Sequence, residues 1–106
     1  MAGVNRGVNP RDVLHPETNW RLIDVIYEGR WWSLALGRWK QDDEWRPVLA
    51  QRWNGDEGEQ GDPVVRGLPT WFIVPDSTYK LFVDSDFVPA EKRDLVVDVL
   101  GLYFDS

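Results

Sequence analysis

The chain has 106 residues, the size of one domain, and 42% of them are hydrophobic, which is enough for a packed core. It has no cysteine, which excludes disulfides, a thiolate nucleophile and cysteine-ligated metal sites and makes a cytoplasmic location the expected one. The net charge is −6, and the apolar runs are too short to span a membrane, so no membrane partner is expected.

The first 19 residues contain glycine, proline and asparagine without apolar periodicity. They predict an extended or flexible N-terminal arm at 1–19, followed by a single domain at 20–106. The arm holds the only histidine, His15. Because one histidine cannot build a catalytic triad or a transition-metal site alone, we assign no catalytic residue, no metal ligand and no cofactor.

Three segments with alternating apolar residues follow, at 20–28, 31–40 and 45–54, and predict a β-meander. A two-residue turn at 29–30 would place Tyr27 opposite Trp32, and a four-residue turn at 41–44 would place Leu36 opposite Leu49. Because directly opposite residues share a face, both turns predict one inward face. That face consists of Ile23, Val25, Tyr27, Trp32, Leu34, Leu36, Leu49 and Trp53.

The opposite face of the predicted meander combines a floor of small residues with an aromatic and cationic margin. The floor is Ser33, Ala35, Gly37 and Ala50, and the candidate binding residues are Trp20, Trp31, Trp39, Arg46 and Arg52. One interpretation is that a helix or a second protomer packs closely on the small floor. The other is an open platform, where tryptophans stack on a ligand and arginines supply charge.

An acidic, glycine-rich loop at 55–62 comes next, and we interpret it as solvated, with calcium binding as the alternative. The stretch 70–74 is β-branched and aromatic without polar alternation, and Pro69 and Pro75 bracket it. This pattern predicts a central strand covered on both faces.

The C-terminal part indicates helices. Residues 78–83 are compatible with a helix or a strand, and a capping residue at Asp76 or Ser77 favours the helix. A second helix is predicted from Pro89 to Gly101, where glycine can end it. The predicted fold class is therefore α+β, with an antiparallel β-meander of four to five strands and one or two C-terminal helices packed on the sheet.

Two sequence pieces carry a resemblance. Leu49-Ala50-x-Arg52-Trp53-Asn54-Gly55 and Arg66-Gly67-x-Pro69-Thr70-Trp71-Phe72-x-x-Pro75 resemble a family of small, functionally uncharacterised bacterial proteins over residues 18–84. The resemblance implies an amphipathic helix directly after Pro75 and implies no activity. In the order of its elements alone, the chain is also similar to the PC4-like fold, which binds single-stranded DNA as a dimer of curved antiparallel strands and a helix.

These observations favour a small, non-enzymatic binding or interaction module. It would self-associate as a homodimer or bind a protein partner through the Trp/Arg-rich face, because interfaces concentrate these residue types. Single-stranded nucleic acid is the alternative partner, and a small enzyme of unknown class is the second alternative. Asp24, expected on the same face beside an arginine, is the carboxylate to watch for catalysis.

Overall fold

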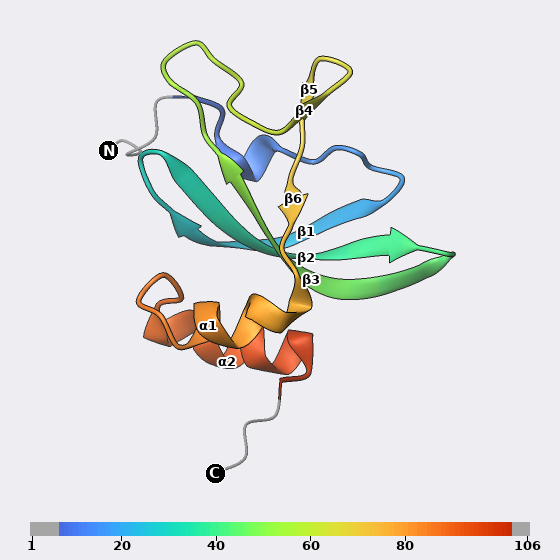
Figure 1. The fold of residues 1–106 in the computed structure, drawn as a ribbon, viewed down its shortest axis with the longest axis vertical. Helices are drawn as coiled ribbons and strands as arrows, with labels where there is room; N and C mark the ends of the chain where they lie inside the picture. The colour runs from blue at the N-terminus through green and yellow to red at the C-terminus, as the bar shows by residue number, and fades with distance from the viewer. Residues whose placement is uncertain (1–6, 103–106) are drawn as a thin grey trace.

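The structure, a computed structural model that describes residues 7–102, confirms the α+β class with a four-stranded antiparallel sheet in the order β1-β2-β3-β6 (Figure 1). The strands are β1 (Trp20–Glu28), β2 (Trp32–Gln41), β3 (Glu44–Trp53) and β6 (Phe72–Ile73). A separate two-stranded sheet pairs β4 (Val64–Val65) with β5 (Leu68–Pro69). Figure 1 shows this small hairpin at one end of the molecule and the helices at the opposite end.

The helical parts are two 3-10 turns and two α-helices. They are η1 (Pro10–Asp12), η2 (Asp76–Thr78), α1 (Tyr79–Val83) and α2 (Ala90–Leu100). The helical interpretation of 78–83 is therefore confirmed, although neither Asp76 nor Ser77 caps α1, whose N-cap is Thr78. Gly101 ends α2 as predicted, in the left-handed conformation with φ 69°. Within residues 7–102, no helix combines the length and the apolar character that crossing a bilayer requires.

The predicted register between β2 and β3 is confirmed, with Trp32 opposite Trp53 and Leu36 opposite Leu49. The turn itself is tighter than predicted, because Gln41 and Glu44 pair with each other. Asp42 and Asp43 alone make the bend, with φ angles of 53° and 62°. Two residues with positive φ match the twist of the flanking strands, and aspartate tolerates that conformation.

The predicted register between β1 and β2 holds where Trp20 pairs with Trp39 and Leu22 with Gly37, but it is wrong from Asp24 to the connection. Glu28 pairs with Ser33, so the connection is two residues longer on the β2 side than the predicted turn. Two irregularities in β1, between Leu22 and Asp24 and between Val25 and Tyr27, then shift the register back. As a result Ile26 joins the core, while Ile23 is exposed.

The predicted central strand at 70–74 is also wrong. Only Phe72 and Ile73 pair with β3, and they form the edge of the sheet. Trp71 and Val74 are buried on either side of this short pairing, while the ring of Phe72 is 53% exposed. The buried side chains of Trp71 and Val74 therefore anchor this segment at the edge of the sheet.

Each face of the sheet is covered in part by the chain itself. Figure 1 shows α1 and α2 gathered on one side and the N-terminal segment crossing the other. The buried core on the helix side contains Ile26, Leu34, Leu36, Leu49, Val74, Tyr79, Val83, Val88 and Val96. The core on the arm side contains Val13, Trp20, Ala35, Val48, Ala50 and Trp71.

The arm is therefore part of the packed domain from residue 7 onward. Val13 is fully buried, and its carbonyl accepts a 2.8 Å hydrogen bond from the indole Nε1 of Trp71. The side chain of Arg11 forms an ion pair with Glu28. The expectation of an extended or flexible arm at 1–19 did not include this docking, because the scattered apolar residues of the segment pack individually and produce no local periodicity. Residues 1–6 and 103–106, which belong to the predicted arm and domain, lie outside the described range.

Candidate functional site

The open platform, one of the two interpretations of the second face, is not present. The small floor receives indole rings from the same chain: Trp20 and Trp71 lie with ring centroids 5.9 Å apart in the arm-side core. A Cβ atom on Gly37 would come within 2.3 Å of Cη2 of Trp20, so the glycine is needed for this close approach. Small residues do permit close packing here, but the occupant is neither a helix nor a second protomer.

The five predicted binding residues are consequently dispersed. Trp20 and Arg52 are each only 2% exposed. Trp39 is half-buried against the arm-side core, and Arg46 is exposed. Trp31 is exposed on the β1–β2 connection, with the Arg30 guanidinium 4.7 Å from its ring centroid.

Asp24 also differs from the prediction. It pairs with Leu36 on the helix side, and its carboxylate forms a 3.0 Å ion pair with Nζ of Lys92 from α2. The same Nζ donates a 2.8 Å hydrogen bond to the carbonyl of Val25. Asp24 therefore ties α2 to the edge strand, with a lysine and not an arginine as its partner.

We expect Asp24→Asn to lower the free energy of unfolding by about 0.2–1 kcal/mol, because both partners are partly exposed and water screens the pair. Urea denaturation of the variant and the wild type at low and high salt measures the difference. A loss that persists unchanged in high salt would contradict the ion-pair interpretation.

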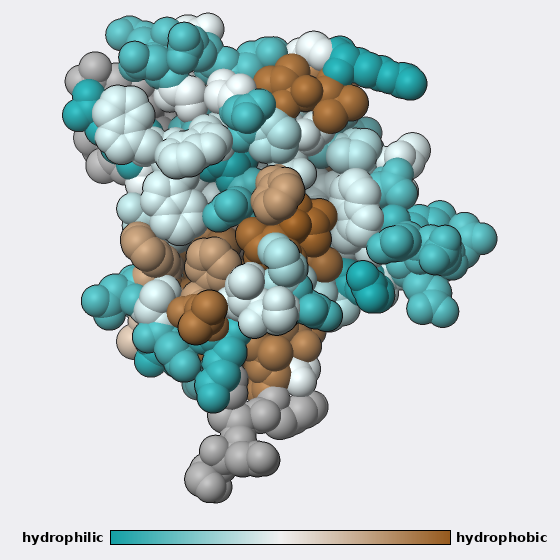
Figure 2. Space-filling model, viewed as in Figure 1, coloured by the Kyte–Doolittle hydropathy of each residue, from teal (hydrophilic) through white to brown (hydrophobic). Residues whose placement is uncertain are grey.

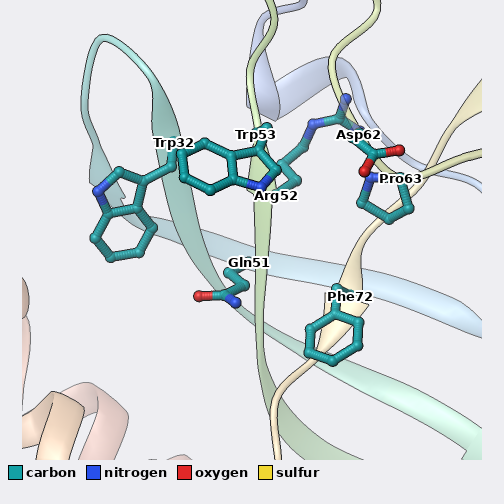
Figure 3. A pocket seen from close by; sticks show the side chains of 7 residues that line it. All are labelled: Trp32, Gln51, Arg52, Trp53, Asp62, Pro63 and Phe72. Carbon is teal, nitrogen blue, oxygen red and sulfur yellow. The ribbon is translucent and has the colours of Figure 1, made fainter.

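A pocket of about 370 Å³ lies on the helix side of the sheet, at the end that the helices leave uncovered. It is lined by Trp32, Gln51, Arg52, Trp53, Asp62, Pro63 and Phe72. Figure 3 shows the rings of Trp32 and Trp53 on one side, Phe72 on the other and the Gln51 amide between them. Gln51 pairs with Leu34 and with Phe72, so the pocket floor is the sheet itself.

The aromatic walls of the pocket are unusually accessible. Trp53 is 61% exposed and Phe72 is 53% exposed. Trp32 packs into a cluster with Tyr27 and Phe87, with ring centroids 4.8 to 5.0 Å apart. Figure 2 shows pale and brown residues gathered over this face between the helices and the polar loops above.

The pocket stays open because the helix-side core covers the middle of the long strands and does not reach the last residue of β3. Leu36 and Leu49, both fully buried in that core, lie near the middle of β2 and of β3. The end of the sheet where Trp53 finishes β3 keeps its aromatic face in solvent.

Arg52 holds the loop that forms the upper wall of the pocket. Its Nη1 donates a 2.6 Å hydrogen bond to the carbonyl of Thr70, and its Nη2 donates to the carbonyl of Gln60. Burial lowers the pKa of Arg52 from its ordinary value, and the negative charge of Asp62 opposes that effect. Arg52 is thus a structural clamp between β3 and the segment 60–70.

Asp62 is placed at the pocket by backbone hydrogen bonds. The N–H of Trp53 donates to the carbonyl of Asp62 at 2.8 Å, and the N–H of Asp62 donates to the carbonyl of Trp53 at 3.0 Å. This reciprocal pair makes an antiparallel bridge in which Trp53 and Asp62 are directly opposite, so their side chains start from the same face. Figure 3 shows the Asp62 side chain at the rim, next to Pro63.

Asn54 fixes the end of β3 on which the pocket stands. Its side-chain Nδ2 donates to the carbonyl of Gly29 at 2.8 Å, and its Oδ1 accepts from Ser33 Oγ at 2.8 Å. Its backbone N–H donates to the carbonyl of Trp31, and its carbonyl accepts from Val8. One buried residue therefore joins β3, the β1–β2 connection and the arm.

The acidic loop uses its carboxylates on its own backbone. Glu59 accepts a hydrogen bond from the N–H of Asp56, and Asp56 accepts one from the N–H of Glu57. Across residues 7–102, no three or more His, Cys, Asp or Glu side chains come together as a metal-binding group.

The predicted candidate residues did not include most of this pocket. The pairing of Trp32 with Trp53 followed from the predicted turn, but both residues were assigned to the buried core. The apolar alternation alone gave no signal of their exposure, because the same inward parity holds for covered and uncovered parts of a strand. Phe72 and Asp62 carried no such signal, since their positions depend on the edge pairing and on the loop.

The groups that line the pocket are suited to binding a ligand. Aromatic faces, one amide and one carboxylate line the pocket, and the buried guanidinium of Arg52 donates to carbonyl groups of the chain.

Comparison of the chain with protein-family models, with curated proteins and with solved structures gave no match.

Proposed function

We propose that the protein is a small, non-enzymatic interaction module that binds a segment of a protein partner in the pocket between Trp32, Trp53 and Phe72. The proposal depends mainly on one observation, the 61% exposure of Trp53 beside a pocket whose opposite wall, Phe72, is 53% exposed. Large aromatic surfaces left in water are unfavourable and mark places where partners bind. Tryptophan is also the residue type that contributes most often to the energetic centre of protein interfaces.

The pocket fits a chain segment better than it fits a nucleic acid. Its rim carries Asp62 and continues into an acidic loop with Asp56, Glu57 and Glu59. Such a rim repels phosphates, and the one arginine at the pocket is buried. The dimeric form and the cytoplasmic location expected from the sequence remain parts of this proposal, with a second copy of the chain as one protein partner.

Selection of random 12-residue peptides from a display library tests the proposal directly. We expect peptides that bind the wild type to bind Trp53→Ala at least about tenfold more weakly, because truncation of a hot-spot tryptophan costs about 2 kcal/mol or more and tenfold corresponds to about 1.4 kcal/mol. The matched control is Trp31→Ala, which removes a tryptophan that is 53% exposed and lies outside the pocket. It should change the dissociation constant less than about twofold.

Two outcomes would contradict the proposal. One is the absence of any peptide whose binding depends on Trp53. The other is salt-sensitive quenching of tryptophan fluorescence by an oligothymidine, abolished by Trp53→Ala, which would assign the pocket to single-stranded nucleic acid. A dimer in sedimentation that dissociates on Trp53→Ala would support protein binding and identify the partner as a second copy.

A further inference from the structure

We infer that the pocket receives the side chain of an arginine from the partner, with its guanidinium stacked on Trp53 and paired with Asp62. This inference rests on the proposed function, because it names the chemical group that the same pocket recognises. Its first support is a pattern among the exposed tryptophans. Trp31 and Trp45 each carry an arginine of this chain, with guanidinium carbons 4.7 and 4.9 Å from the ring centroids.

Trp53 departs from that pattern. It is the most exposed of these three tryptophans, and no cation among residues 7–102 lies over its ring. Guanidinium groups stack favourably on indole faces, most strongly when the contact is shielded from water. Among the three exposed tryptophans of the described residues, Trp53 is therefore the one whose ring can accept a cation from a binding partner.

The charge at the rim has the complementary sign. The antiparallel bridge places Asp62 directly opposite Trp53, so both side chains start from the same face, and the Asp62 side chain is at the surface. Arg52 is a cation whose pKa the negative charge of Asp62 raises, and its terminal nitrogens already donate to the carbonyls of Thr70 and Gln60. The Asp62 carboxylate consequently keeps acceptor positions that a second guanidinium can use.

The shape and floor of the pocket fit a long side chain with a planar head. Trp32 and Phe72 supply apolar walls for the aliphatic stem, and the half-buried Gln51 amide supplies an acceptor between them (Figure 3). An arginine offers five N–H donors in a plane, so it can stack on Trp53 while donating to Asp62 and Gln51. A lysine has a compact ammonium head that cannot stack in this way, so arginine is the group we assign.

The test uses the full chain labelled with ¹⁵N and two blocked tripeptides, Gly-Arg-Gly and Gly-citrulline-Gly. Citrulline has nearly the same shape as arginine but no charge. We expect the arginine peptide to shift the indole N–H of Trp53 and the amide of Phe72 in a saturable way. The citrulline peptide should bind about tenfold more weakly, which corresponds to the loss of the cationic stacking and of the ion pair.

Two variants assign the binding to the pocket. Asp62→Asn should weaken the arginine peptide about three- to tenfold, whereas Glu57→Gln, which removes an equal charge from the same loop, should change it less than about twofold. Trp53→Leu is the second variant, because loss of Asp62 also removes a counter-charge from the buried Arg52. It keeps an apolar side chain, removes the stacking surface and should abolish the preference for arginine over citrulline.

The outcomes separate this inference from the proposed function. Equal binding of both tripeptides would overturn the arginine assignment, and selected 12-residue peptides that depend on Trp53 but contain no arginine would do the same while leaving the interaction module intact. Shifts spread evenly over the acidic surface, unaffected by Trp53→Leu, would also overturn it as non-specific attraction. If no peptide of any kind binds at the pocket, both proposals are wrong.

Discussion

Trp20→Ala is expected to lower the free energy of unfolding by about 3–5 kcal/mol, the range for deleting a buried large aromatic side chain. The indole is only 2% exposed and fills the space above Gly37 and beside Trp71. Its Nε1 has no hydrogen-bond partner within the described residues, so the loss comes from packing and the cavity left behind. Chemical denaturation monitored by far-UV circular dichroism measures the change.

Trp31→Ala is the control for this prediction, since the same residue type is removed from a site that is 53% exposed. It should change the free energy of unfolding by less than about 1 kcal/mol, including the cation–π contact with Arg30. Similar small losses in both variants would mean that the arm-side face of the sheet is open to water, as the platform interpretation required.

Asn54→Ala is expected to lower the free energy of unfolding by about 2–4 kcal/mol. The residue is fully buried, and truncation leaves the carbonyl of Gly29 and the hydroxyl of Ser33 without the partner that each now has. Buried groups left unpaired cost about 1–3 kcal/mol each. Thermal and urea unfolding of the variant provide the measurement.

Asn19→Ala is the matched control for Asn54. The Asn19 side chain also makes two hydrogen bonds, to the carbonyl of Lys40 and from Thr18 Oγ1, but at positions that water can reach. Its replacement should cost about 1 kcal/mol or less, because water substitutes for the lost partner. Equal costs for the two variants would contradict the role of Asn54 as the buried junction of three segments.

The β2–β3 hairpin was predictable because its pattern and its turn agree. Leu34, Leu36 and Leu49 alternate with other residues, so they indicate which face of each strand is apolar. The turn at 41–44 fixes the register, which places Leu36 opposite Leu49. In β1 the pattern does not fix the register, since Leu22-Ile23-Asp24-Val25-Ile26-Tyr27 is apolar at both parities. The two irregularities in β1 determine which side of this segment faces the helices, and no residue type in the segment predicts them.

The covered face was not predictable, because its two halves come from distant parts of the chain. Val13 and Trp71 are 58 positions apart, and neither lies in a segment with a periodic pattern. The small floor of Ala35, Gly37 and Ala50 indicated close packing without indicating which element would supply it. The candidate site was not predictable for a related reason, since the exposure of Trp53 depends on which part of β3 the helix-side core covers.

The contact between Val13 and Trp71 also has a meaning for biosynthesis. The ribosome delivers the arm first, yet the indole that receives it emerges about two-thirds of the way along the chain, 58 residues later. Until Trp71 emerges, the arm-side face of the nascent strands leaves Trp20 and the small side chains of Ala35 and Ala50 without that part of their cover. Closure of the arm is thus among the last steps that the growing polypeptide can take.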